Sequence, residues 1–262
     1  MTSENYSATT QLFLSLISWL DSYGAREWNL RSVSATSAAI FVGTRLVLGK
    51  KYKVDWDAFI HAVLSGTGSA MCYYLDIFAA VDMRGVSEPL GSVQCLGPLT
   101  SLHRILPAIT QGYAICDIIN GFTLGGRDAI SHGFATFFVM ALFNEMNASH
   151  IITPMLLMEI STIVLATMKA TFYTPAMKML TIALFVLLFF ITRVVMTPYI
   201  IIETIIDVKK NPGECHHPAL FTSIVVFSVF FIGLNFYWFV KIIAKVHRKL
   251  SGKEKIDDLE RS

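Results

Sequence analysis

Charged residues are scarce in this chain. Only 15% of its 262 residues are Asp, Glu, Lys or Arg, whereas soluble domains carry about 25%. The hydrophobic share is 54% and the mean hydropathy is +0.56. The few charges gather at the two ends and in short connectors. This pattern excludes an ordinary soluble domain and is typical of segments that cross a bilayer.

Other features are missing as well. The N-terminus, MTSENYSATT, has no basic region before its short apolar piece, so we expect no cleavable signal peptide. The net charge of +2 is too small to suggest nucleic acid as a partner. No internal repeat or pair of broken helices is visible, which makes a transporter or channel the least favoured class. His216 and His217 are adjacent in a connector and predict no metal site.

Long apolar stretches are what the chain does contain. Seven are long enough, or nearly so, to cross a hydrocarbon core of about 30 Å at about 1.5 Å per residue. The first is interrupted by Arg45, so six spans is the alternative count. The sequence predicts an all-α membrane protein of about seven transmembrane helices, at residues 33–49, 56–81, 104–122, 128–145, 150–170, 176–205 and 218–244.

Lys and Arg are divided unevenly between the two sides of these spans. With seven spans, fourteen lie on the side of the C-terminus, six lie on the other side, and Arg193 lies inside a span. Because cytoplasmic connectors carry the excess, we predict a cytosolic C-terminus. Cys95 and Cys215 then fall in the two longest lumenal connectors, where they could form a disulfide or remain two free thiols.

Ionisable residues inside the spans are the strongest functional signal, because each costs at least about 2.5 kcal/mol at bilayer depth without a partner or a cavity. Tyr113 and Asp117 are spaced i, i+4 in the third span, and Asp128 and His132 repeat that spacing in the fourth. Each pair therefore shares one helical face.

Three other spans carry polar groups at depth. His61 lies one turn inside the second span, Glu159 and Ser161 lie midway along the fifth, and Arg193 lies in the sixth. Buried pairs that only fix helix packing could explain them: Glu159 with Arg193, and Asp117 with either His61 or His132. A polar interior cavity explains the whole set more economically, and in it Asp117 could orient His132 as a base.

The residues also resemble a known family. The segments that carry this likeness, in order, are FIHAVLSG, GYAICDIINGFTLGGRDAISHGFATFF, MLLMEISTIVL, FFITRVVMTPYIIIETI and GLNFYWFVKIIAKVHRKL. Together they resemble the TLC domain of ceramide synthases, the translocating-chain-associated membrane protein and small proteins of lipid homeostasis. The likeness divides the chain into a polar or amphipathic segment (1–32), an N-terminal transmembrane helix (33–49), a TLC domain (50–250) and a charged cytosolic tail (251–262).

The resemblance implies a fold and a set of cavity residues. The fold would be a six-helix ring around a long, narrow cavity, with one additional N-terminal helix. By resemblance, His61, Tyr113, Glu159 and Ser161 would line the lipid cavity, and His132 and Asp117 would be the tentative catalytic residues. We expect Asp128 and Arg193 to line the same cavity because of their positions inside predicted spans. No metal or resident cofactor is implied, and acyl-CoA would be a co-substrate.

One departure from the family bears on catalysis. Ceramide synthases carry two adjacent histidines where this chain has His132 followed by Gly133. Losing one of two cooperating groups can cost several orders of magnitude in rate. The missing second histidine therefore weakens the case for acyl transfer. A single histidine with an aspartate partner can still act as a base.

Three functions stay open from the sequence. The first is a non-catalytic protein of lipid homeostasis that binds a lipid or acyl chain in its cavity. The second is a ceramide synthase-like N- or O-acyltransferase that uses acyl-CoA and a sphingoid base or another lipid. The third is a protein-interaction or trafficking factor. Family habit places all three in the endoplasmic reticulum and leaves a homodimer open.

Overall fold

Most of the described part of the chain is helical. The computed structural model describes residues 15, 18–19, 28–48, 54–84, 100–124, 127–146, 148–210 and 218–251, and no strand occurs among them. Five helices are uninterrupted: α2 (Leu30–Leu48), α3 (Trp56–Arg84), α5 (Ser101–Leu124), α6 (Arg127–Glu145) and α11 (Pro218–Leu250). The predicted all-α class is confirmed.

Two further stretches each change helix type along their length. The first contains α7 (Ser149–Ile152), the 3₁₀ helix η4 (Thr153–Met158) and α8 (Glu159–Thr167). The second contains α9 (Pro175–Phe189), the π-helix η5 (Phe190–Met196) and α10 (Thr197–Lys210). Thr174 starts the second stretch, because its hydroxyl accepts a hydrogen bond of 3.3 Å from the Met177 N–H and Pro175 suits the first helical turn.

Two helical stretches in the described residues are long and apolar enough to cross a membrane. They are Pro175–Lys210 and Phe221–Arg248, with mean hydropathies of 2.5 and 2.0. Helices such as α3 and α5 carry more Ser, Thr, Gly, Asp and His, which lowers their hydropathy. The membrane character is thus supported by two helices, and the predicted count of seven spans remains a prediction.

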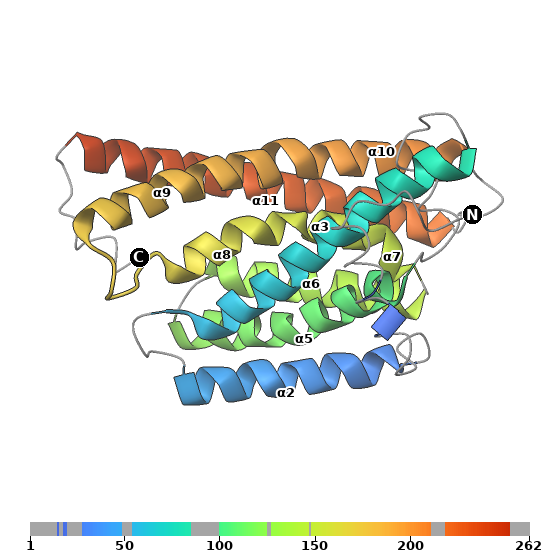
Figure 1. The fold of residues 1–262 in the computed structure, drawn as a ribbon, viewed down its shortest axis with the longest axis horizontal. Coiled ribbons are helices and arrows are strands. Elements are labelled where there is room, and N and C mark those ends of the chain that lie inside the picture. The colour runs from blue at the N-terminus through green and yellow to red at the C-terminus, as the bar shows by residue number, and fades with distance from the viewer. Residues whose placement is uncertain are drawn as a thin grey trace.

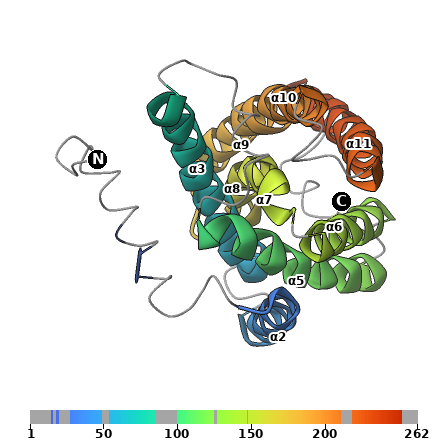
Figure 2. The ribbon, with the colours of Figure 1, turned by 90° about the vertical axis from the view of Figure 1, so that its right-hand side faces the viewer.

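The helices surround a central stretch (Figures 1 and 2). Viewed from the end, α3, α5, α6, α11 and α10 lie around α7 and α8, and α2 packs outside against α5. Figure 1 shows α9, α10 and α11 along one side of the molecule and α2 along the opposite side. The N-terminal helix α2 lies outside the other helices, as expected. The stretch from α7 to α8, which was expected to be part of the ring, lies inside it in this view, so the six-helix ring remains a prediction.

Glycines set the spacing between α5 and its neighbours. A Cβ at Gly112 would lie 2.7 Å from the Ala38 nitrogen of α2, and one at Gly133 would lie 2.9 Å from the Ile118 nitrogen of α5. Backbone atoms cannot move aside as a flexible side chain can. The absence of a side chain at these positions therefore allows α2 and α6 to approach α5 closely.

Candidate functional site

A pocket lies inside the bundle between α5, α6, the α7–η4–α8 stretch, α10 and α11. It leaves about 600 Å³ of space between atoms, including space open to the outside. Most of its wall is apolar and includes Met140, Phe143, Ile152, Phe227 and Phe231. The pocket therefore presents a surface suited to hydrocarbon.

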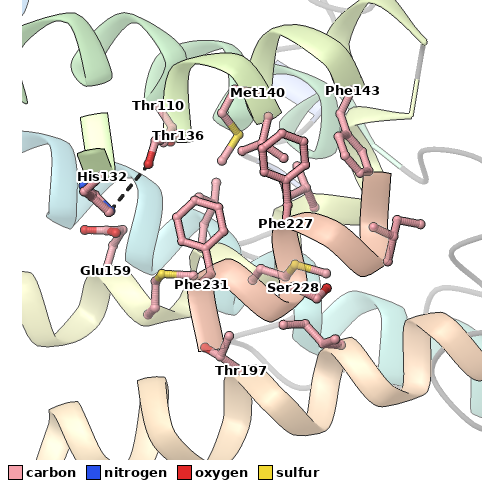
Figure 3. Close-up of a pocket in the computed structure, with 17 residues that line it drawn as sticks. Thr110, His132, Thr136, Met140, Phe143, Glu159, Thr197, Phe227, Ser228 and Phe231 are labelled. Atoms are coloured by element: carbon pink, nitrogen blue, oxygen red, sulfur yellow. Dashed lines mark hydrogen bonds between the residues drawn. The ribbon is translucent and has the colours of Figure 1, made fainter. Parts of the chain in front are cut away.

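Polar side chains gather at one end of this pocket. In Figure 3, His132, Glu159, Thr110 and Thr136 lie together, whereas Phe143 lies at the opposite end. His132 and Phe143 are eleven residues apart on α6, which corresponds to about 16 Å along a helix. The pocket is thus long, with a polar end and an apolar end.

His132 is held by a carboxylate. Its Nδ1 lies 3.2 Å from Asp117 Oδ2, and its Nε2 lies 3.4 Å from the Thr136 hydroxyl. The His132 side chain is 17% exposed and the Asp117 side chain is 18% exposed. An aspartate on one ring nitrogen fixes the tautomer and leaves the other nitrogen to act as an acceptor. This is one of the pairings that the sequence predicted.

Gly133 is part of the same arrangement. A Cβ there would lie 2.9 Å from the Ile118 nitrogen and 3.1 Å from the Asp117 Cβ. A histidine at this position would push α6 away from α5, the helix that carries Asp117. The absence of a side chain at Gly133 is therefore required by the packing that places Asp117 beside His132.

Aromatic side chains of α11 cover His132. Its ring centroid lies 6.1 Å from that of Phe231, with an interplanar angle of 87°, and 5.4 Å from that of Trp238. Phe231 also lines the pocket. His132 consequently sits where α6, α11 and the pocket meet.

Arg193 forms a buried network behind Glu159. Its guanidinium donates to Ser161 Oγ at 3.0 Å and to Thr162 Oγ1 at 2.9 Å. It also lies 3.5 Å from Glu159 Oε1 and 3.5 Å from Asn235 Oδ1. The predicted Glu159–Arg193 pair is therefore present, at a distance that is long for a strong ion pair.

The backbone around Arg193 is a π-helix, which is rare and occurs frequently at functional sites. Arg193 is 6% exposed and Glu159 is 7% exposed. Of the two, Glu159 lines the pocket. The network thus positions one buried carboxylate at the polar end of the pocket.

His61 and Tyr113 form a second buried pair next to the pocket. Their rings stack with centroids 4.0 Å apart and an interplanar angle of 3°, and Phe41 of α2 packs edge-on against both. His61 Nε2 lies 3.2 Å from Thr110 Oγ1. His61 therefore contacts a pocket residue through Thr110, and Asp117 pairs with His132 in this structure.

Some predicted residues lie outside what the structure describes. Asp128 is in α6, but its side chain is not among those described. Cys95 and Cys215 also lie outside the described residues. Cys72 and Cys116 are buried free thiols, and no cluster of three or more His, Cys, Asp and Glu suited to a metal ion occurs within the described ranges.

The structure adds residues that the sequence did not single out. Asp57 pairs with Arg45 at 3.2 Å, and Asp76 pairs with His103 at 3.0 Å. Both pairs join different helices, so no helical spacing indicates them. Thr136 follows His132 by four residues, and that spacing could have placed it on the same face.

The comparisons with known proteins bear on the same region. A family model described as the TLC domain matches residues 94–244, which is more than half of the chain. The matched range contains Tyr113, Asp117, His132, Glu159 and Arg193, and it excludes His61. Neither the comparison with curated proteins nor the comparison with solved structures found a match.

Proposed function

The chain belongs to the TLC domain family, and from this premise we propose that it is a multi-pass protein of lipid homeostasis that binds a lipid acyl chain in its pocket. The family and the apolar helices support a membrane protein related to lipids. The seven spans, the cytosolic C-terminus and the endoplasmic reticulum belong to the same proposal.

The observation that carries the proposal is the polarity of the pocket. Each methylene removed from water contributes about 0.8 kcal/mol, so the apolar wall of the pocket favours a hydrocarbon chain. The polar end offers Glu159, His132 and Thr136 to a head group. A carboxylate and a carboxylate-bound imidazole suit a head group that donates hydrogen bonds, such as the amine or hydroxyl of a sphingoid base.

Native mass spectrometry of the purified full chain tests the binding. We expect a lipid to co-purify with the wild type and to be lost in Ile224→Trp, which places a larger side chain at the pocket wall. Val229→Trp is the matched control, because Val229 is on the same helix and 69% exposed. A lipid-free wild type, or equal lipid content in the two variants, would contradict the proposal.

The His132–Asp117 pair favours a second function, acyl transfer. A lipid amine or hydroxyl would attack the thioester carbonyl of acyl-CoA, so that a C–N or C–O bond forms and the C–S bond breaks. His132 Nε2 would take the proton from the nucleophile and return it to the leaving thiolate, while Asp117 stabilises the charged ring.

Transfer of a radiolabelled acyl group by the purified protein tests this second function. We expect His132→Ala to abolish transfer and Asp117→Asn to reduce it by about a hundredfold or more, because the pair acts as a unit. Val229→Trp again serves as the folded control. Transfer that survives both substitutions would remove the pair from the reaction. The described contacts do not bear on the trafficking alternative or on a homodimer, which remain predictions.

A further inference from the structure

One face of α3 is polar along most of the helix. Its residues follow each other at intervals of four or three, so they lie in one line. Each of them is 3% exposed or less. We call this line the α3 polar face, and its members are Asp57, His61, Ser65, Ser69, Cys72 and Asp76.

Two neighbours on this face each have a buried atom that lacks a partner. Asp57 Oδ1 and His61 Nδ1 make no hydrogen bond within the described structure. Both side chains are 1% exposed. Buried polar atoms are nearly always satisfied by protein or by ordered water. Residues at i and i+4 of a helix have Cβ atoms about 5 to 6 Å apart, so these two side chains are neighbours on one face.

The outer end of this pair reaches the edge of the bundle. Asp57 Oδ2 lies 3.2 Å from Arg45 NH1, and the Arg45 side chain is 27% exposed. Asp55, which immediately precedes α3, is exposed. Asp57 therefore connects a solvent-accessible ion pair to the interior.

The inner end reaches the pocket. His61 Nε2 lies 3.2 Å from Thr110 Oγ1, and Thr110 lines the pocket. The Ser65 hydroxyl lies 3.1 Å from the same Thr110 oxygen. A proton that arrives at His61 Nδ1 can leave from Nε2, because an imidazole can accept on one nitrogen and donate from the other.

We infer that Asp57, an internal water and His61 form a proton path from the Arg45 edge to the pocket, with Thr110 as its last member. The path would exchange protons between the aqueous edge and groups bound at the polar end of the pocket. It uses the pocket of the proposed function but does not depend on which lipid the pocket holds.

The path does not continue along the rest of the α3 polar face. The Ser69 hydroxyl donates a hydrogen bond of 2.7 Å to the Thr153 carbonyl oxygen. Cys72 packs in an apolar cluster with Leu106 and Val139. Asp76 is paired with His103 beyond that cluster. The apolar packing around Cys72 therefore separates the two ends of the helix.

Charged groups of both signs face His61 from the elements around it. The carboxylates are Glu159 on α8 and Asp117 on α5, and the cations are Arg193 on η5 and, when protonated, His132 on α6. Tyr113 covers one face of the ring. The charge of a proton at His61 would therefore interact with the ionisable residues at and around the polar end of the pocket.

Exchange of the ring N–H protons of two buried histidines tests the path. His103 is the internal reference, because it is 2% exposed and both of its ring nitrogens have partners, Thr100 and Asp76. In full-length, lipid-free, ¹⁵N-histidine-labelled protein moved to D₂O, we expect the His61 ring to exchange at least about tenfold faster than the His103 ring. Equal or slower exchange at His61 would overturn the path.

A pair of variants then tests the route. Asp57→Leu removes the carboxylate that would hold the water, so we expect His61 exchange to slow toward the His103 rate. Asp76→Asn lies on the far side of the apolar cluster and should leave His61 unchanged. Fast exchange at His61 in a folded Asp57→Leu protein would contradict the route through Asp57. Because lipid is absent from these measurements, a failed path and a failed lipid-binding proposal would be distinguished.

Discussion

Two histidine–aspartate pairs of almost equal geometry occur in the described part of this protein. His103 lies 3.0 Å from Asp76, and His132 lies 3.2 Å from Asp117. The first pair is 2% and 4% exposed, whereas the second is 17% and 18% exposed. Only the second borders the pocket. The distance between the two groups therefore does not distinguish a structural pair from a candidate site, but their surroundings do.

The two histidines differ in whether a ring nitrogen remains available to a ligand. Both nitrogens of His103 are occupied, by Asp76 and by Thr100 at 2.9 Å, inside packed helices. The Nε2 of His132 has only the Thr136 hydroxyl at 3.4 Å and faces the pocket. A weakly held nitrogen beside a cavity is available to a ligand. We therefore assign a packing role to the first pair and the candidate functional role to the second.

The largest expected effect is a difference in folding stability between variants of the two pairs. Removing one partner of a fully buried pair costs about 3 to 5 kcal/mol, so His103→Ala should strongly destabilise the protein. His132→Ala removes a partly exposed partner and should cost about 1 kcal/mol or less. Denaturant unfolding in detergent measures both.

Lipid content should rank the same two variants in the opposite order from stability. His103→Ala that remains folded should keep its lipid, and His132→Ala should lose most of it. If the two substitutions cost the same stability and change lipid content equally, the two pairs do not differ in role.

A smaller effect is expected at the close contact beside the second pair. Gly133→Ala places a Cβ 2.9 Å from the Ile118 nitrogen, so α5 and α6 must separate at a cost of about 1 to 3 kcal/mol. Gly43→Ala and Gly233→Ala are matched controls, because a Cβ at either meets nothing within 4 Å. Each should stabilise its helix by up to about 1 kcal/mol.

Gly133→His extends this test to the adjacent histidine pair that the resemblance led us to expect. We expect it to destabilise more than Gly133→Ala and to restore no acyl transfer, since it displaces Asp117 from His132. A stable Gly133→His protein with acquired transferase activity would show that the glycine is not required by packing.

Hydroxyl partners should give the next effect in size. Thr100→Val removes a hydrogen bond of 2.9 Å to His103 and should cost about 1 kcal/mol. Thr136→Val removes a longer bond to His132 and should cost less than Thr100→Val, while it changes lipid affinity. A larger stability loss at Thr136 than at Thr100 would reverse the assignment of roles.

The smallest effect is expected at an exposed ion pair. Arg31 lies 2.6 Å from Glu145, with side chains 80% and 53% exposed. Because both side chains are exposed, the pair is screened by salt and contributes little to stability.

Thermal unfolding of Arg31→Ala beside the wild type checks this pair. We expect a difference at neutral pH that is barely resolved, that shrinks with added salt, and that vanishes in acid. A large difference that does not change with added salt would contradict the small contribution expected for this pair.

The sequence predicted the parts of this account that depend on helical spacing and on charge in apolar segments. Asp117, His132, Glu159 and Arg193 stand out because each is an ionisable group within an apolar stretch. The His103–Asp76 pair was not singled out, because His103 lies outside the predicted spans and so does not stand out as an ionisable group at bilayer depth. The packing role of Gly133 also depends on how close α5 lies to α6, which no local pattern encodes.

Photo-cross-linking with a lipid amine tests the central claim most directly. The probe carries a diazirine either next to the amine or at the end of its alkyl chain. We expect the first position to label residues around His132 and Glu159, and the second to label residues around Phe143 and Ile224. Labelling confined to the outer surfaces of α9 and α11, or the same residues labelled from both positions, would contradict a lipid bound along this pocket.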